Sequence, residues 1–238
     1  MASIIDERGF NQGFELTRAQ RLRLRRRAEA IAAECTRQTP DVHIMEIGCG
    51  TGELAAELVQ LTNTRVTGVD LSIKFIEQAK ALHCHEKLSF IVADLSKTGP
   101  ASEQDCYDYI VGNGILHHLY HHLDSVLPSL RRWLRPGGRL IFWEPNLMNP
   151  YIWLIFSFSP FRRMAKLEPD EMAFTPSFIT EKLLGSGFTH VTATTRDFLL
   201  PNTPDILITP VIRSNDVFEK TPGFRCLAQS IFIVADVG

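Results

Sequence analysis

Three glycines at alternate positions are the first residues in the sequence that could do chemistry. Gly48, Gly50 and Gly52 directly follow the apolar stretch 42–47 and precede residues 53–61, which are typical of a helix. Glycines at such a turn allow positive φ angles and a close approach of a ligand to the main chain. The first N–H groups of the helix point to the same place. The pattern therefore predicts a cofactor site where a buried strand turns into a helix.

The spacing of these glycines limits the kind of cofactor. A dinucleotide fingerprint, G-x-G-x-x-G, would need its third small residue at position 53, where the chain has Glu53. A carboxylate at the start of a helix would repel a pyrophosphate. The spacing thus argues against an NAD-dependent oxidoreductase, while a glycine-rich turn of purely structural use stays open at this point.

A cluster of histidines, H-H-L-Y-H-H, offers groups that can move a proton near neutral pH. It begins four residues after Asn113, which follows an expected strand over 107–111. Ligands in α/β sheets bind outside the carboxyl ends of the strands, so Asn113 and the first histidine should face the reactive end of the cofactor. His117 is the candidate catalytic base, with His118 in reserve. A purely structural role for His117 explains the sequence equally well.

The same histidines have the spacing of paired metal ligands. His117 with His121, and His118 with His122, lie four residues apart, as ligands on one face of a helix would. The glutamate of an H-E-x-x-H arrangement is missing, and surface or helix-cap histidines explain His121 and His122 more simply. We therefore expect no metal site.

An acid stands at the end of the next predicted strand. Asp70 follows the stretch 64–69, about 18 residues after the last glycine, where its two oxygens can accept hydrogen bonds from both ribose hydroxyls. Ser72 is a typical N-cap for a helix over 73–82, which leaves Leu71 at the edge of an adenosine pocket.

Three strings resemble the motifs of one family. They are E-x-G-x-G-x-G led by Glu46, F-I-V-A-D-L with Asp94, and L-R-P-G-G-R-L-I-F. All three resemble motifs of class I S-adenosylmethionine-dependent methyltransferases of the type 11/12-like, small-molecule kind, over about residues 42–145. The resemblance implies S-adenosylmethionine as cofactor. It also implies these cofactor-binding residues: Glu46, Gly48, Cys49, Gly50, Gly52, Asp70, Leu71, Asp94, Leu95, Asn113 and Gly114.

The expected fold class is α/β. The family implies a Rossmann-like, seven-stranded, mostly parallel sheet of order 3-2-1-4-5-7-6 with helices on both faces and an inserted lid. The predicted strands cover 42–47, 64–69, 88–92, 107–111, 139–143, 191–196 and 229–234. A chain of 238 residues, 45% of them hydrophobic, can bury one sizeable core, so residues 1–238 are expected to form a single methyltransferase domain.

Three segments lie outside the sheet. Residues 1–37 should contain a cap helix, whose arginines are best explained as a solvated face, with recognition of an anion as the alternative. Residues 145–174 hold an aromatic run, and residues 197–225 are irregular and rich in proline. Both are expected to form lid or substrate segments. Packing of the aromatic run as plain core is an equal alternative, and membrane contact a weaker one.

Composition excludes several classes of protein. The net charge of −2 gives no basic field, so nucleic acid is not an expected partner. Five scattered cysteines without C-x-x-C spacing indicate a reducing compartment. Acidic residues stand where a signal peptide would be apolar, and no apolar stretch approaches the ~20 residues that span a bilayer. We expect a cytoplasmic monomer or homodimer without stable membrane insertion.

The function predicted from these features is transfer of a methyl group from S-adenosylmethionine to an oxygen or nitrogen atom of a small, hydrophobic molecule. A protein that binds S-adenosylmethionine or S-adenosylhomocysteine without catalysis stays open, because Asn113 is compatible with binding alone. An NAD-dependent oxidoreductase is the weaker alternative, because of Glu53. The sequence does not identify the acceptor.

Overall fold

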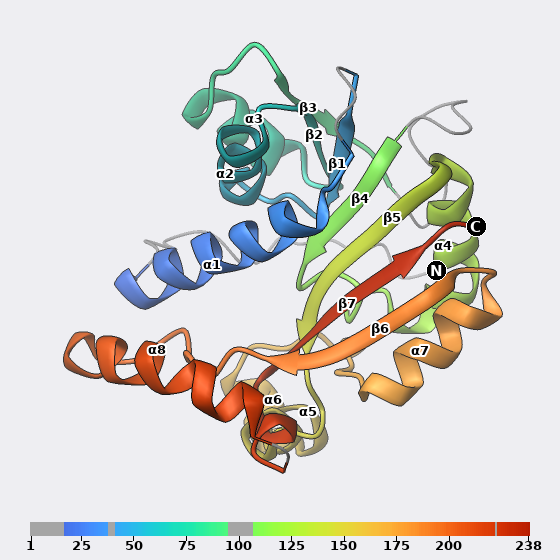
Figure 1. The fold of residues 1–238 in the computed structure, drawn as a ribbon. Coiled ribbons are helices and arrows are strands. Elements are labelled where there is room, and N and C mark those ends of the chain that lie inside the picture. Colours follow the sequence, from blue (N-terminus) through green and yellow to red (C-terminus); the bar gives the residue numbers. More distant parts are fainter. Residues whose placement is uncertain (1–16, 38–40, 95–106, 222) are drawn as a thin grey trace.

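The structure is a computed structural model that describes residues 17–37, 41–94, 107–221 and 223–238 (Figure 1). Leu95, predicted to bind the cofactor, and the first 16 residues of the expected cap segment lie outside the described residues.

The described residues form one sheet of seven strands in the order β3-β2-β1-β4-β5-β7-β6, as the sequence predicted. Neighbouring strands from β3 to β5 pair in parallel, whereas β7 runs antiparallel to both β5 and β6. The strands are β1 (His43–Ile47), β2 (Arg65–Asp70), β3 (Leu88–Val92), β4 (Tyr107–Asn113), β5 (Leu134–Pro145), β6 (Thr189–Arg196) and β7 (Ser230–Asp236).

Helices connect the strands and cover both faces of the sheet. They are α1 (Arg18–Glu34), α2 (Glu53–Thr62), α3 (Ile73–Leu82), α4 (Leu123–Trp133), α5 (Pro150–Ser157), α6 (Ser159–Met164), α7 (Pro176–Gly185) and α8 (Asp205–Lys220), with short 3-10 turns η1 (Tyr120–His122) and η2 (Arg225–Leu227). One apolar core joins the sheet to α1, α2 and α3, and a second joins the opposite face to α4 and α7 (Figure 1). The strands are therefore buried from both sides, as their apolar runs require.

Helix α8 corrects the prediction that residues 197–225 are irregular. Pro204 is the N-cap residue, whose N–H has no partner within the helix in any case. Pro210 lies inside the helix, where its missing N–H removes one main-chain hydrogen bond. Ile208 is buried in a small apolar cluster with Ala19 and Leu199, which holds α8 against α1. Burial of this face offsets the loss at the proline.

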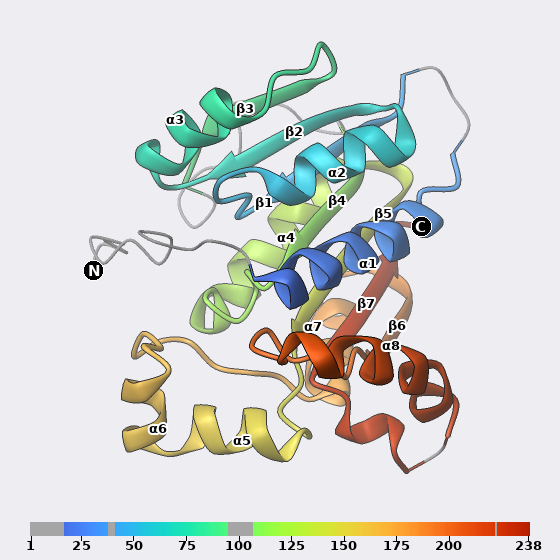
Figure 2. The ribbon, with the colours of Figure 1, turned by 90° about the vertical axis from the view of Figure 1, so that its left-hand side faces the viewer.

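Two arginines of α1 depart from the prediction of a solvated face, whereas Arg18, Arg21 and Arg25 are exposed as predicted. Thr17 caps the helix, and α1 lies across the sheet beside β4 and β5 (Figure 2). Arg23 and Arg27 follow each other at i,i+4, so they share one side of the helix. Both point inward, onto the carboxylate of Asp197 at the end of β6. Intramolecular ion pairing thus explains two of the arginines.

The aromatic run after β5 forms α5 and α6, two short helices that pack on each other. Asn149 caps α5 by accepting hydrogen bonds from the N–H groups of Tyr151 and Ile152. Among the described helices, none is both long and apolar enough to cross a bilayer.

Candidate active site

The glycine turn joins β1 to α2 in a conformation that excludes side chains. Gly48 has a φ of 65° and Gly52 a φ of 88°. A Cβ atom on Gly52 would lie 2.6 Å from the ring of Phe90, and one on Gly48 would lie 2.6 Å from Ile115. The N–H of Gly50 donates to Oδ2 of Asp70 at 2.9 Å, which ties the turn to the end of β2. The close packing explains why the sequence needs glycines here.

Carboxylates surround this turn. Glu46 is 2% exposed, and one of its oxygens, Oε2, is buried without a hydrogen-bond partner in the described part of the chain. Burial raises the pKa of Glu46 well above its usual range, the charges of Glu53 and Asp70 add to the rise, and the N–H of Ala55 in α2 partly opposes it. A corner of this polarity suits a cationic group and repels a phosphate. The orphaned oxygen of Glu46 and the negative charge therefore fit the sulfonium and ammonium of S-adenosylmethionine.

The other predicted cofactor residues lie around the same edge of the sheet. Asp70 also accepts a hydrogen bond from the N–H of Ser72, the N-cap of α3, at 2.9 Å. Leu71 is 39% exposed, and Asp94 lies two residues beyond β3, half-buried. Cys49 is buried, and burial raises the pKa of its thiol, so it is no nucleophile.

His117 and His118 lie in a turn between β4 and η1, and not on a helix, where their spacing from His121 and His122 would matter. Glu144, near the end of β5, explains the turn. Its carboxylate accepts hydrogen bonds from the N–H groups of Ile115 at 3.0 Å, Leu116 at 2.7 Å and His117 at 3.3 Å. Three main-chain donors thus hold residues 115–117 around one buried carboxylate.

The same carboxylate orients the ring of His117. Oε2 of Glu144 lies 2.9 Å from Nδ1 of His117, and the Glu144 side chain is fully buried. A carboxylate on Nδ1 fixes the tautomer and leaves Nε2 as the basic nitrogen. Sequence reasoning missed Glu144. The sequence does contain a signal for Glu144, because this acid ends the apolar run R-L-I-F-W-E-P in the same way that Asn113 ends the neighbouring strand.

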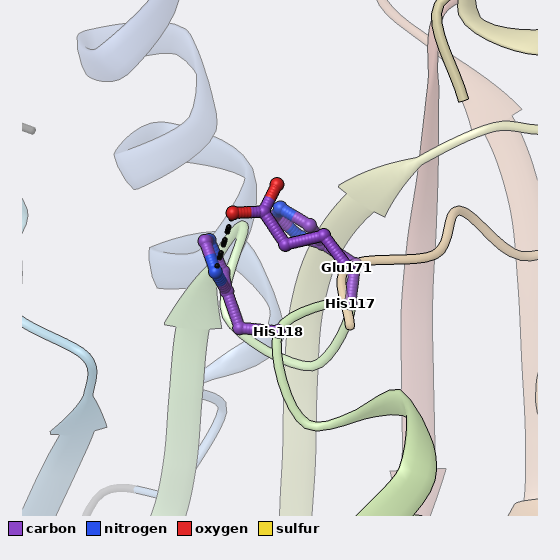
Figure 3. Close-up of side chains that lie close together, drawn as sticks. All are labelled: His117, His118 and Glu171. Carbon is purple, nitrogen blue, oxygen red and sulfur yellow. Dashed lines mark ion pairs between the residues drawn. The ribbon is translucent and has the colours of Figure 1, made fainter. Parts of the chain in front are cut away.

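A second histidine–carboxylate pair lies beside the first. Nδ1 of His118 is 3.1 Å from Oε1 of Glu171, and the rings of His117 and His118 are 4.2 Å apart (Figure 3). Burial lowers the pKa of His118, but its contact with Glu171 raises it more, so the net shift is upward. For Glu171, burial raises the pKa, and His118 lowers it below the usual range. Sequence reasoning missed Glu171 as well, because it lies in an unpatterned segment between α6 and α7.

Asn113 contacts helix α1. Its Oδ1 accepts a hydrogen bond from Nη1 of Arg27 at 2.6 Å, while Nη2 of Arg27 donates to Asp197 and Ser230. Burial lowers the pKa of Arg27 to about 10, the charge of Arg23 adds to this, and Asp197 opposes it. Gly114, next along the chain, donates its N–H to the carbonyl of Trp143 at 2.7 Å. Helix α1 is thus fastened to the end of β4.

The aromatic run contributes one residue to the site. Phe156 is buried, and its ring meets that of His117 edge to face at 6.0 Å. Trp153 is 48% exposed and contacts Phe158 instead. Of these two residues in the expected lid segment, Phe156 therefore lies against the site and Trp153 lies at the surface.

Comparison with known proteins identifies the central part of the chain. A family model described as "Methyltransferase domain" matches residues 45–140. The malonyl-[acyl-carrier protein] O-methyltransferase of Halalkalibacterium halodurans is 36% identical over 102 residues, which are 42% of this chain and 37% of that protein. The hybrid PKS-NRPS synthetase thnA of Trichoderma harzianum is 31% identical over 124 residues, 49% of this chain and 3% of that protein. The chain thus spans only a minor part of either relative.

A solved structure shares the fold over most of the chain. The S-adenosylmethionine-dependent methyltransferase from Mesorhizobium loti has a TM-score of 0.62 and 20% identity, covering 88% of this chain and 97% of that one. This fold, the sheet order 3-2-1-4-5-7-6 and the domain match over residues 45–140 together support the class I S-adenosylmethionine-dependent methyltransferase family that the sequence predicted.

Proposed function

We propose that the protein transfers a methyl group from S-adenosylmethionine to an oxygen or nitrogen atom of a small hydrophobic molecule, and that His117 takes a proton from this atom. The observation that carries the proposal is the hydrogen bond between Nδ1 of His117 and the buried carboxylate of Glu144. A neutral amine needs no base, whereas a hydroxyl oxygen must lose its proton. A hydroxyl acceptor therefore fits this pair best.

The cofactor supplies a methyl group on a positively charged sulfur. The glycine turn would let it approach the main chain, Asp70 would accept hydrogen bonds from the ribose, and the unpartnered oxygen of Glu46 and the charges of its acidic neighbours would favour the cationic end. Each carboxylate oxygen has more than one lone pair, so Asp70 can keep its contacts to Gly50 and Ser72 while it binds a ribose hydroxyl.

His117 would act on the proton that the acceptor loses. Nε2 accepts this proton, and the carboxylate of Glu144 stabilises the imidazolium that forms, without itself taking the proton. Alignment of acceptor and methyl group supplies most of the remaining rate, because the displacement needs little other help from the protein.

A hydrophobic acceptor is proposed because Phe156 borders His117 and the apolar helix α5 follows soon after β5. The name of one relative, a malonyl-[acyl-carrier protein] O-methyltransferase, supports oxygen as the atom that is methylated. The net charge of −2 favours a small molecule over a nucleic acid.

The proposal is tested with cofactor that carries deuterium in its methyl group. The chain is incubated with a panel of apolar phenols, enols and amines, and products are identified by mass spectrometry. Label on a hydroxyl oxygen is the expected result. Binding of S-adenosylhomocysteine without labelled product from any class of acceptor would favour the non-catalytic alternative.

Replacement of Asp70 by alanine is expected to weaken cofactor binding by about 1–3 kcal/mol, because the ribose hydroxyls lose their acceptor. Calorimetry with S-adenosylhomocysteine measures the change, and NAD should show no binding to either protein. Thermal denaturation without ligand separates loss of the ribose contact from loosening of the turn at Gly50. Equal affinity in both proteins would remove Asp70 from the cofactor site.

Replacement of Phe156 by serine is expected to raise the KM of the acceptor several-fold, because the ring of His117 loses its apolar neighbour. Serine at the exposed Trp153 is the matched control on the same helix and should leave KM nearly unchanged. Steady-state kinetics with the identified acceptor gives both values. A large loss of melting temperature at unaltered KM in the Phe156 variant would make this residue plain core.

A further inference from the structure

The carboxylate of Glu171 is buried without the donors that such a group needs. Its side chain is 2% exposed, and neither oxygen receives a well-directed hydrogen bond from the residues that the structure describes, although Oε1 lies 3.1 Å from Nδ1 of His118. A buried carboxylate with unused lone pairs is costly unless a cation or a donor satisfies it. Figure 3 shows this carboxylate pointing toward the imidazole rings of His117 and His118 from a distant segment of the chain.

We propose that His117, His118 and Glu171 form a binding site for a divalent cation of the zinc class. One ligand atom of each residue lies within 4.8 Å of the other two. Two imidazole nitrogens and one carboxylate are a ligand set of zinc sites that keep a fourth position for water or substrate. The imidazoles favour zinc, cobalt or nickel over magnesium and calcium.

The surroundings hold these ligands in place before any ion binds. Glu144 bonds Nδ1 of His117, which is the usual arrangement when Nε2 of the same ring binds a metal. The N–H of Met172 donates to the carbonyl of His117 at 3.1 Å, so the segment with Glu171 is tied to the histidine turn. Arg162 donates to the carbonyls of Glu168 at 2.7 Å and Glu171 at 3.0 Å. His118, at 31% exposed, is the least buried of the three ligands, and its contact with Glu171 fixes its ring.

The spacing of the histidines alone predicted no metal site, because spacing compares only possible ligands within residues 117–122. The structure supplies a third ligand from the segment before α7, far along the chain. His121 and His122 lie outside this group of ligands among the described residues.

Zinc and proton transfer then compete for one nitrogen. This consequence rests on the proposed function, in which Nε2 of His117 accepts the proton of the acceptor. An ion on Nε2 occupies the lone pair that would take this proton. Zinc is therefore expected to inhibit methyl transfer, and a chelator to restore it.

Binding is tested by calorimetric titration of the chelator-treated full chain with zinc chloride. We expect one ion per chain, no measurable heat with magnesium chloride, and affinity lowered at least 100-fold in Glu171→Gln and His118→Asn. His121→Asn is the matched control within the same histidine run and should bind like the wild type. Melting temperatures without metal establish that each variant folds.

Cobalt distinguishes this site from the exposed string His83-Cys84-His85. Cobalt on imidazole and carboxylate ligands gives visible bands without the charge-transfer absorption of a thiolate, and Cys84→Ser should leave the spectrum unchanged. No binding by the wild type, equal binding in Glu171→Gln and His118→Asn, or a thiolate band that Cys84→Ser removes would each overturn the proposal.

The rate measurement separates the site from the proposed function. Zinc should inhibit the wild type, and a chelator should reverse the inhibition. In Glu171→Gln, zinc should lower the rate less, compared with the rate of the same variant without zinc. Both results would support competition at His117. Activation by zinc would overturn that competition. Zinc binding with the expected variant pattern, in a chain that transfers no methyl group when free of zinc, upholds the site and overturns the proposed function instead.

Discussion

Replacement of His117 by alanine is expected to lower the turnover of a hydroxyl acceptor by about 10²-fold or more. The acceptor then keeps the proton that must leave before or during methyl transfer. Cofactor affinity should stay nearly unchanged, because the glycine turn and the carboxylates around it are untouched. Single-turnover kinetics with bound cofactor measures the chemical step, and calorimetry with S-adenosylhomocysteine measures the affinity.

Two further variants make this result specific to proton transfer. Glu144→Gln keeps the shape of the side chain but removes the charge that stabilises the imidazolium, so it should also slow turnover. His121→Asn changes a histidine outside the pair and should not. Unchanged turnover in His117→Ala over about pH 6–9, the range in which histidine titrates, would assign His117 to structure alone.

Replacement of Asp197 by asparagine is expected to destabilise the fold by about 3–5 kcal/mol. Its Oδ2 lies 2.6 Å from Nε of Arg23 and 2.9 Å from Nη2 of Arg27, and all three side chains are largely buried. The variant leaves two guanidinium groups without a counter-ion. In a chain of this size each kcal/mol shifts the melting temperature by about 2–4 °C, so calorimetry should resolve the loss.

The loss should also depend on pH. Burial raises the pKa of Asp197, but Arg23 and Arg27 lower it more, so the folded-state pKa lies below that of the unfolded chain. The stabilisation is therefore present above the unfolded pKa of about 3.9 and is lost as the pH falls through the folded one. Wild type and variant should converge in acid. Asp205→Asn, which removes the exposed, 4.0 Å partner of Arg18, is the control and should change little. If Asp197→Asn had an equally small effect, the buried cluster would make no net contribution to the free energy of unfolding.

Most of the sheet could be predicted because its central strands are apolar runs that end at or just before a glycine, an acid or an amide. The N-cap role of Ser72 and the strand-to-helix glycine turn followed from local chemistry in the same way. Helix α8 could not be predicted in this way, since its prolines are local signals against a helix, and its stability comes from contact with α1. Tertiary packing overrides propensity there.

The positions of the residues proposed to bind the cofactor could be read from the sequence, because they follow the ends of successive strands. The surroundings of the histidines could be predicted only in part. Glu144 and Glu171 instead reach the histidines from separate segments, so no spacing within the histidine run reports them. The inward direction of Arg23 and Arg27 likewise depends on Asp197. This residue is 174 positions from Arg23 and 170 positions from Arg27 in the sequence.

The antiparallel course of β7 has a practical consequence. The strand begins at Ser230, level with Pro145 at the end of β5 beside the site, and runs to Asp236, level with Arg139. Val237 then bonds Gly138 at the start of β5, so Gly238 lies at the end of the sheet opposite to His117 (Figure 1). A fluorescent label attached at position 238 would therefore lie at the end of the sheet away from His117, and it would report on the molecule without contacting the histidines.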